Sequence, residues 1–107
     1  MNSGPRISSP ALTPGAFKRE VRRWARRIGV EPREIRLRDM TRKLASATSE
    51  GRITFDRSLV TAKADQRTNV IVHELVHLKV GNHGALFRSL VRAHLGAAPR
   101  PEPAEPR

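Results

Sequence analysis

Residues 70–78 read Val-Ile-Val-His-Glu-Leu-Val-His-Leu, and they belong to a stretch, roughly 66–80, that is typical of a helix. Apolar residues occupy almost every side of this helix. We therefore expect it to be buried at the centre of the fold. Asp65 is suited to its N-cap, and Gly81 with Asn82 is suited to its end.

The two histidines of this stretch are spaced for binding one metal ion. His73 and His77 point in nearly the same direction on a helix, about 40° apart around the axis. Two imidazoles in this arrangement can bind zinc, and Glu74 can act as a general base. His83 adds a third ligand, because the helix break lets the chain turn back. In a continuous helix residue 83 would lie about 15 Å along the axis from residue 73.

Alternatives to a catalytic zinc site remain open at this stage. His73 could be a buried histidine that is hydrogen-bonded to the backbone, with His77 at a polar rim. A structural zinc site could be closed by three histidines and one carboxylate. The apolar surroundings favour a metal, because buried imidazoles and a carboxylate are costly without partners. His94 is interpreted as a packed or rim histidine, with support of the metal ligands as the alternative.

The length and composition predict one small domain. Prolines gather near both ends of the 107 residues, so we expect a flexible arm over 1–14, a domain over 15–96 and a disordered tail over 97–107. The absence of cysteine excludes disulfides and thiolate ligands. No apolar run approaches the ~20 residues that span a bilayer, and no secretory signal is visible. We expect a cytoplasmic protein without a membrane partner.

The remaining pattern predicts an α+β fold. An amphipathic helix is expected over 15–28, alternating residues indicate strands at 35–38 and 53–55, and a last helix is expected over 85–95. The polar segment 41–52 is interpreted as a turn region, and the two strands as part of a short antiparallel sheet. The predicted order is N-terminal helix, sheet, central metal-motif helix and C-terminal helix.

The formal net charge of +11 favours polyanionic partners, nucleic acid above all. The alternative is an ordinary solvated face on a helix that packs through its apolar side. One Trp and three Phe give little support for a base-stacking platform. The candidate nucleic-acid surface lies on the 15–28 helix and consists of Arg19, Arg22, Arg23, Arg26 and Arg27.

Residues 71–78 and 82–87 resemble the zinc segment of the YgjP-like metallopeptidase domain, and more distantly that of the SprT-like zinc peptidases. That segment looks like Val-Val-His-Glu-Leu-x-His-Leu, a short spacer, and Asn-His-x-x-x-Phe. The resemblance covers about residues 17–95, including matches at 35–40 and 51–53. It implies a zincin-like fold, Zn²⁺ bound by His73, His77 and His83, catalysis by Glu74 and a polypeptide substrate.

Two features depart from the family pattern. Residues 44–47 read Leu-Ala-Ser-Ala where the family has Trp-Gly-Ser-Cys, so only the serine is kept. Family members are also usually longer, with an additional N-terminal β-rich region.

The leading hypothesis is a zinc-dependent metallopeptidase-like hydrolase, with an extended substrate along a sheet edge for which 53–55 is the candidate. One alternative is a metal-dependent nucleotide phosphohydrolase, although no glycine-rich phosphate cradle is present. The other is a nucleic-acid-associated module with a structural zinc.

Overall fold

The structure is a computed structural model that describes residues 12–96. The tail expected over 97–107 and most of the arm expected over 1–14 lie outside these residues. At the start of the described part, the Leu12 amide donates to the Val60 carbonyl at 2.9 Å. Thr13 is the N-cap of the first helix, and its hydroxyl accepts a hydrogen bond from the Ala16 amide.

The helix predicted over 15–28 is confirmed as α1, Pro14–Ile28. Its apolar stripe is buried and includes Phe17, Val21 and Ile28. Gly29 ends the helix in the left-handed region, at φ 90°, where a residue without Cβ is least strained. The stripe and both caps fix α1 against the core, while its opposite side faces solvent.

The sheet differs from the antiparallel arrangement that we expected. Its strands are β1 (Glu34–Arg38), β2 (Ala45–Ala47) and β3 (Arg52–Asp56), in the order β1-β3-β2. β1 pairs with β3 in parallel, whereas β2 pairs with β3 antiparallel, so the sheet is mixed. The segment 41–52, interpreted as a turn region, contains β2. Residues 53–55, the candidate substrate edge, lie in the central strand and are already paired on both sides.

A short 3-10 helix, η1 (Arg57–Thr61), leads from β3 to α2 (Ala64–Lys79). The N-cap of α2 is Lys63 rather than Asp65, because the helix begins at Ala64 and Asp65 lies in its first turn. The Asp65 carboxylate accepts a hydrogen bond from the next amide, that of Gln66. The expected last helix is present as α3, Ala85–Leu95.

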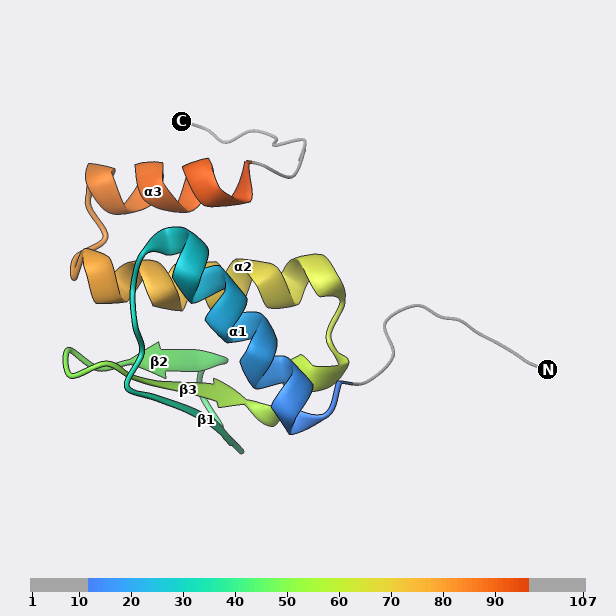
Figure 1. The fold of residues 1–107 in the computed structure, drawn as a ribbon. Coiled ribbons are helices and arrows are strands. Elements are labelled where there is room, and N and C mark those ends of the chain that lie inside the picture. Colours follow the sequence, from blue (N-terminus) through green and yellow to red (C-terminus); the bar gives the residue numbers. More distant parts are fainter. Residues whose placement is uncertain (1–11, 97–107) are drawn as a thin grey trace.

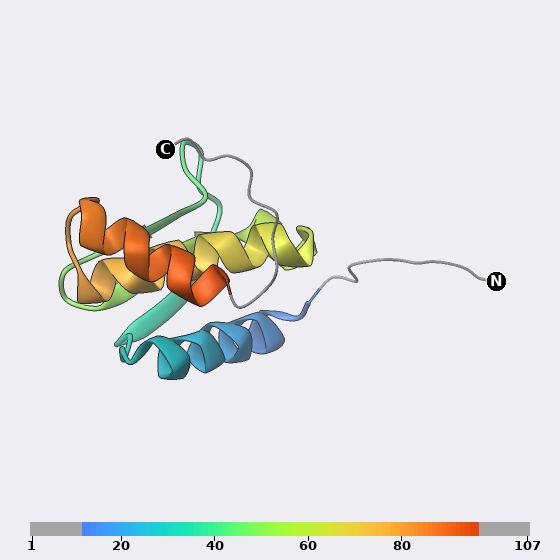
Figure 2. The same ribbon diagram turned by 90° about the horizontal axis from the view of Figure 1, so that it is seen from above.

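The helix α2 lies at the centre of the fold, as predicted. It runs between α3 and the sheet, and α1 packs along one side of it (Figures 1 and 2). Ile71, Val72, Leu75 and Val76 are fully buried in the core. Among the described residues, no helix is long and apolar enough to span a membrane. The fold is α+β, and it surrounds the histidine-bearing helix on several sides.

Candidate metal centre

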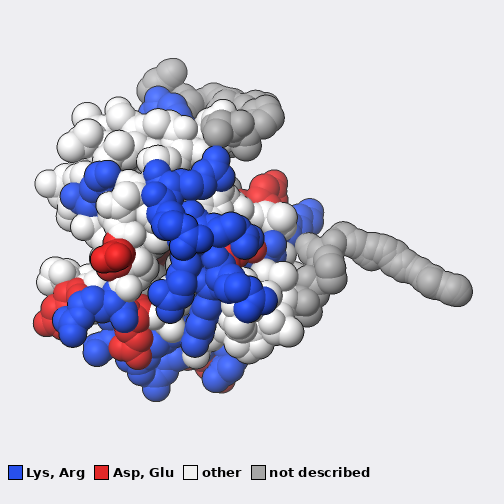
Figure 3. Space-filling model, in the orientation of Figure 1, with Lys and Arg blue, Asp and Glu red and all other residues white. Residues whose placement is uncertain are grey.

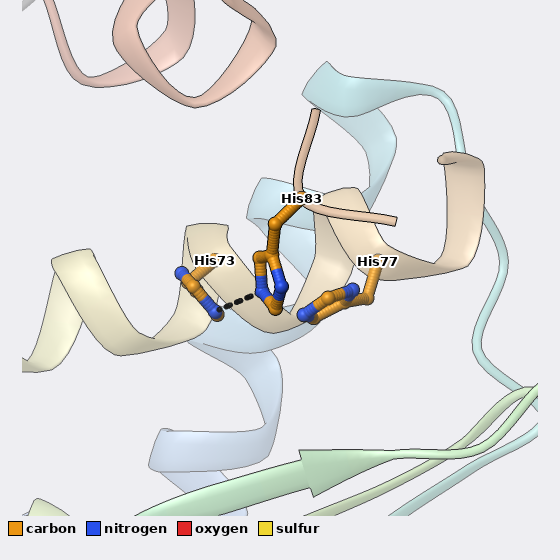
Figure 4. Close-up of side chains that lie close together, drawn as sticks. All are labelled: His73, His77 and His83. Atoms are coloured by element: carbon orange, nitrogen blue, oxygen red, sulfur yellow. Dashed lines mark hydrogen bonds between the residues drawn. The ribbon is translucent and has the colours of Figure 1, made fainter. Parts of the chain in front are cut away.

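The three predicted histidine ligands lie together. His73 and His77 project from α2, and His83 reaches the same point from the loop that follows (Figure 4). One ring nitrogen from each histidine lies within 4.8 Å of the others, and the Nε2 atoms of His73 and His83 are 3.4 Å apart. Within residues 12–96, no other group of three or more His, Asp or Glu side chains gathers in this way.

The spacing of one pair of these nitrogens, those of His73 and His83, fits a tetrahedral metal ion. Zinc binds imidazole nitrogen at about 2.0–2.1 Å, so two ligands of a tetrahedral site lie about 3.3 Å apart. The 3.4 Å separation between His73 and His83 matches this value. The carboxylate of Glu74 does not belong to the group, so the three histidines leave a fourth position for water or substrate.

The loop that carries His83 is held by short-range hydrogen bonds. The Asn82 side chain accepts a hydrogen bond from the Gly84 amide at 3.0 Å. The guanidinium of Arg88, on α3, donates to the His83 carbonyl at 3.1 Å. These bonds allow an exposed loop residue to meet two histidines of a helix. The role of Arg88 was not predicted from the sequence, because it depends on the path of the loop between α2 and α3.

Phe87 lies against all three histidines. Its ring centroid is 5.0 Å from that of His73, 4.6 Å from that of His77 and 4.7 Å from that of His83. Phe87 is also the buried residue of α3. In the sequence it ends the 82–87 segment that resembles the Asn-His-x-x-x-Phe pattern of the family. The structure adds that its ring packs on the imidazoles and restricts their positions.

Burial shifts the titration of two histidines towards the form that binds metal. The pKa of His73 is lowered by burial and, to a smaller extent, by the charges of His77 and His83. Burial and His83 also lower the pKa of His77, and a hydrogen bond with the backbone of Gly81 opposes this decrease. A neutral imidazole has the free lone pair that coordination requires.

Glu74 is a buried carboxylate that accepts no hydrogen bond from residues 12–96. Arg67 and Glu74 are the buried charged side chains of residues 12–96. Arg67 is satisfied, because it pairs with Glu20 at 3.3 Å and donates to the Ala62 carbonyl. No described residue donates a hydrogen bond to the Glu74 carboxylate, so the group is left for water or a ligand. Burial raises the pKa of Glu74, and the charge of Lys43 opposes this increase.

An open pocket of about 340 Å³ lies beside His73 and Glu74. One wall is α2 and the other is the segment that leads into β2. Leu44, at the start of that segment, is 40% exposed although it is a large apolar residue. From the sequence, residues 44–47 were noted as a departure from the family pattern and as part of the turn region 41–52, not as the wall of a pocket. The pocket is lined by Lys43, Leu44, Ala45, Asn69, Val70, His73 and Glu74.

His94 does not belong to the group of three. It lies half-buried on α3, outside the set of ring nitrogens that could hold one metal ion.

Comparison with known proteins adds a family and a fold. The model of the family "YgjP-like, metallopeptidase domain" matches residues 12–101. The crystal structure of the metallopeptidase zymogen of Pyrococcus abyssi abylysin is similar, with a TM-score of 0.62. The match has 24% sequence identity and covers 69% of this chain and 75% of that one, so it bears on the fold alone. Comparison with curated proteins gave no significant match.

Proposed function

This chain belongs to the YgjP-like metallopeptidase domain family, and from that premise we propose that it is a zinc-dependent peptidase with ligands His73, His77 and His83 and general base Glu74. Membership makes the chain a metal-dependent peptidase domain that acts on polypeptides. One observation supports the assignment of zinc, of its three ligands and of the general base. Three imidazole nitrogens converge beside a buried carboxylate that no described residue partners.

The donor set supports zinc over the hard divalent cations. Three neutral imidazoles suit Zn²⁺, whereas Mg²⁺ and Ca²⁺ prefer carboxylate and carbonyl oxygens. The number of donors supports catalysis over a structural role. Structural zinc sites are almost always closed by four protein ligands, and this group offers three. The Glu74 carboxylate remains free to act on a water molecule.

Zinc held by His73, His77 and His83 would supply Lewis acidity that polarises the scissile carbonyl. Glu74 then has two tasks. Its carboxylate takes a proton from the attacking water as the water oxygen bonds to the scissile carbonyl carbon. When the carbon–nitrogen bond breaks, Glu74 returns this proton to the amine that leaves. Burial raises the pKa of Glu74, which strengthens the carboxylate as a base for the first of these tasks.

Within residues 12–96, β2 pairs with a strand on one side only, and its other edge supports a position for the substrate backbone. The Thr48 amide donates to the Arg52 carbonyl, and the Asp56 amide donates to the Leu44 carbonyl. The backbone amides and carbonyls of Leu44, Ser46 and Thr48 are therefore directed towards β3. In an antiparallel ladder the alternate residues, Ala45 and Ala47, direct their amides and carbonyls outwards. An extended peptide can add to this edge, with one side chain over Leu44 and Val70.

The variant Glu74→Gln tests whether Glu74 is the general base. We compare wild type with Glu74→Gln for cleavage of an unfolded protein such as casein, after loading with one equivalent of zinc. Glu31→Gln, at an exposed position, is the matched control. We expect Glu74→Gln to lose about 10²–10⁴-fold in rate while it retains one zinc per chain. The control should cleave like wild type.

Two outcomes would overturn parts of the proposal. Equal cleavage by wild type and Glu74→Gln would remove Glu74 from the chemistry. If both proteins bind one zinc ion and neither cleaves any unfolded substrate, a structural zinc would be favoured. The phosphohydrolase alternative gains no support, because Lys43 is the one cation among the residues that line the pocket.

A further inference from the structure

The solvent side of α1 carries five arginines. Arg19, Arg22, Arg23, Arg26 and Arg27 are all exposed, and we call them the arginine face. Their spacing of three and four residues places them in adjacent rows on the helix surface. Lysine and arginine side chains form a continuous band over α1 in the space-filling view (Figure 3). From residue 19 to residue 27 the band extends about 12 Å along the helix axis.

The positive charges of the arginine face are not neutralised within the described residues. Glu20 is the one acidic residue of α1, and it pairs with Arg67 of α2 instead. The other ion pairs of residues 12–96 join Glu34 and Asp39 to arginines outside α1. Like charges three and four positions apart destabilise a helix. An external polyanion would relieve this repulsion.

The arginine face and the candidate metal centre lie on opposite sides of α2. Arg67 and Lys79 are the α2 side chains that bond to α1, through Glu20 and the Ile28 carbonyl. Successive residues of a helix are rotated by about 100° around its axis. The mean direction of the Arg67 and Lys79 side chains is therefore about 160° away from the mean direction of His73 and His77. Figure 4 agrees, since the imidazoles lie on the near side of α2 and α1 lies behind it. A ligand on α1 therefore leaves the histidines accessible.

The chemistry of the surface favours phosphate of a duplex over other anions. Arginine binds phosphate through a planar, bidentate guanidinium, and five of the six basic residues of α1 are arginines, the sixth being Lys18. Leu44 and Leu86 are the large apolar residues exposed among the described residues, and neither lies on α1. The apolar stripe of α1 is buried in the core, so the helix presents no exposed apolar side with which to enter a membrane. Trp24 is half-buried and covered by Arg27, whose guanidinium carbon lies 4.7 Å from the ring centroid, which leaves no platform for unstacked bases.

We propose that the arginine face docks α1 on the backbone of double-stranded DNA without reading its sequence. The major groove of B-DNA is about 12 Å wide and admits α1, so that the arginines contact the phosphates along the edges of the groove. The major groove of A-form RNA is too deep and narrow to admit a helix. The contacts are guanidinium to phosphate. This proposal does not depend on peptidase activity.

The salt dependence of binding tests the proposal quantitatively. We measure the anisotropy of a labelled 20-base-pair duplex of arbitrary sequence, with the full chain, between 50 and 200 mM KCl. Five phosphate contacts predict a log–log slope of about −4.5, that is, about a 500-fold loss of affinity over this range. Arg19→Gln/Arg22→Gln/Arg26→Gln should lower the slope to about −1.8 and the loss to about 12-fold.

A matched variant separates the arginine face from bulk charge. Arg38→Gln/Arg42→Gln/Arg92→Gln removes the same charge from exposed positions outside α1. We expect its slope to stay within about one unit of wild type, and both triple variants to keep wild-type helicity and zinc affinity. Saturating duplex should leave zinc affinity unchanged.

Several outcomes would overturn the proposal. If the two triple variants lower the salt dependence of binding equally, net charge explains the binding and the arginine face has no specific role. Equal or tighter binding of duplex RNA or of single-stranded DNA would exclude the major-groove geometry. Binding to vesicles of phosphatidylcholine and phosphatidylserine in the absence of duplex binding would identify a membrane surface instead.

Discussion

His83 is the proposed ligand that α2 does not position. It is exposed, and it reaches His73 only because the chain leaves α2 at Val80 in an extended conformation and turns back at Asn82. Arg88 and Phe87 then fix it from α3. The third ligand therefore depends on tertiary packing, whereas His73 and His77 depend on helix periodicity alone.

Replacing His83 should weaken zinc binding without unfolding the domain. We expect His83→Ala to lower zinc affinity by more than about 100-fold, because losing a ligand should exceed the 10–100-fold effect of losing a group that only orients one. His94→Ala is the matched control, since His94 lies on α3 outside the group. Competition with a chelating fluorophore measures both affinities. Equal losses in the two variants would remove His83 from the ligand set.

At the scale of elements, the helices and the strands predicted at 35–38 and 53–55, now β1 and β3, were predictable, whereas β2 and the pairing of the strands were not. α1 and α3 show one apolar stripe each, and α2 is long and apolar, so local spacing was enough to identify them. β2 contains only Ala45, Ser46 and Ala47, which are small residues without the β-branched or aromatic character of a strand. Its strand character comes from pairing with β3 and from packing on α2. The parallel pairing of β1 with β3 is likewise non-local, so neither the strand order nor the place of β2 at the edge of the described sheet could be derived.

The same distinction applies to the site. The histidines follow from spacing, and Glu74 follows from its position beside His73. The pocket does not follow from sequence spacing, because Leu44 and Val70 come together only when β2 packs on α2. The packing of Phe87 on the imidazoles was missed for the same reason.

Asp56, at the end of β3, fixes the segment that forms one wall of the pocket. Its carboxylate accepts hydrogen bonds from the Met40 amide at 2.7 Å and the Ser58 amide at 3.0 Å. Its own amide donates to the Leu44 carbonyl at 2.8 Å. The pKa of Asp56 is lowered, chiefly by a hydrogen bond with the Ser58 side chain and then by the Met40 and Ser58 amides.

The lowered pKa of Asp56 predicts a stability contribution that disappears in acid. A carboxyl group with a lower pKa in the folded state than in the unfolded state stabilises the fold above its unfolded value, 3.8. This contribution is lost as the pH falls through the folded pKa. Asp56→Asn should therefore unfold at lower urea than wild type at pH 6, and the difference should shrink below pH 3.8.

Urea unfolding at several pH values checks this prediction. Asp39→Asn is the control, because the Asp39 side chain is 88% exposed and its one ion pair within residues 12–96 is with Arg57, across 3.2 Å at the surface. We expect the control to change the urea midpoint little at any pH. A difference between Asp56→Asn and wild type that persists unchanged to pH 2 would contradict the role of the ionised carboxylate.

At the scale of the whole molecule, a metal ion would join elements that the small core holds only in part. α2 packs on α1, α3 and β2, and α3 contributes Phe87 as its one buried residue. A zinc ion held by His73, His77 and His83 connects α2 to the loop that begins α3. Because the unfolded chain does not preassemble these three ligands, the free energy of zinc binding adds to the free energy of unfolding.

Removing the metal should therefore lower the melting temperature. At free zinc 100-fold above Kd the stabilisation is about 2.7 kcal/mol, and a domain of this size gains about 4–8 °C for each kcal/mol. We expect a decrease of about 10–20 °C when a chelator is added, measured by circular dichroism. Glu74→Gln should show the same decrease, because it keeps all three ligands, whereas His83→Ala should melt at nearly the same temperature with and without zinc. An unchanged melting temperature of the wild type under chelation, with zinc verified as lost, would show that the metal does not join α2 to α3.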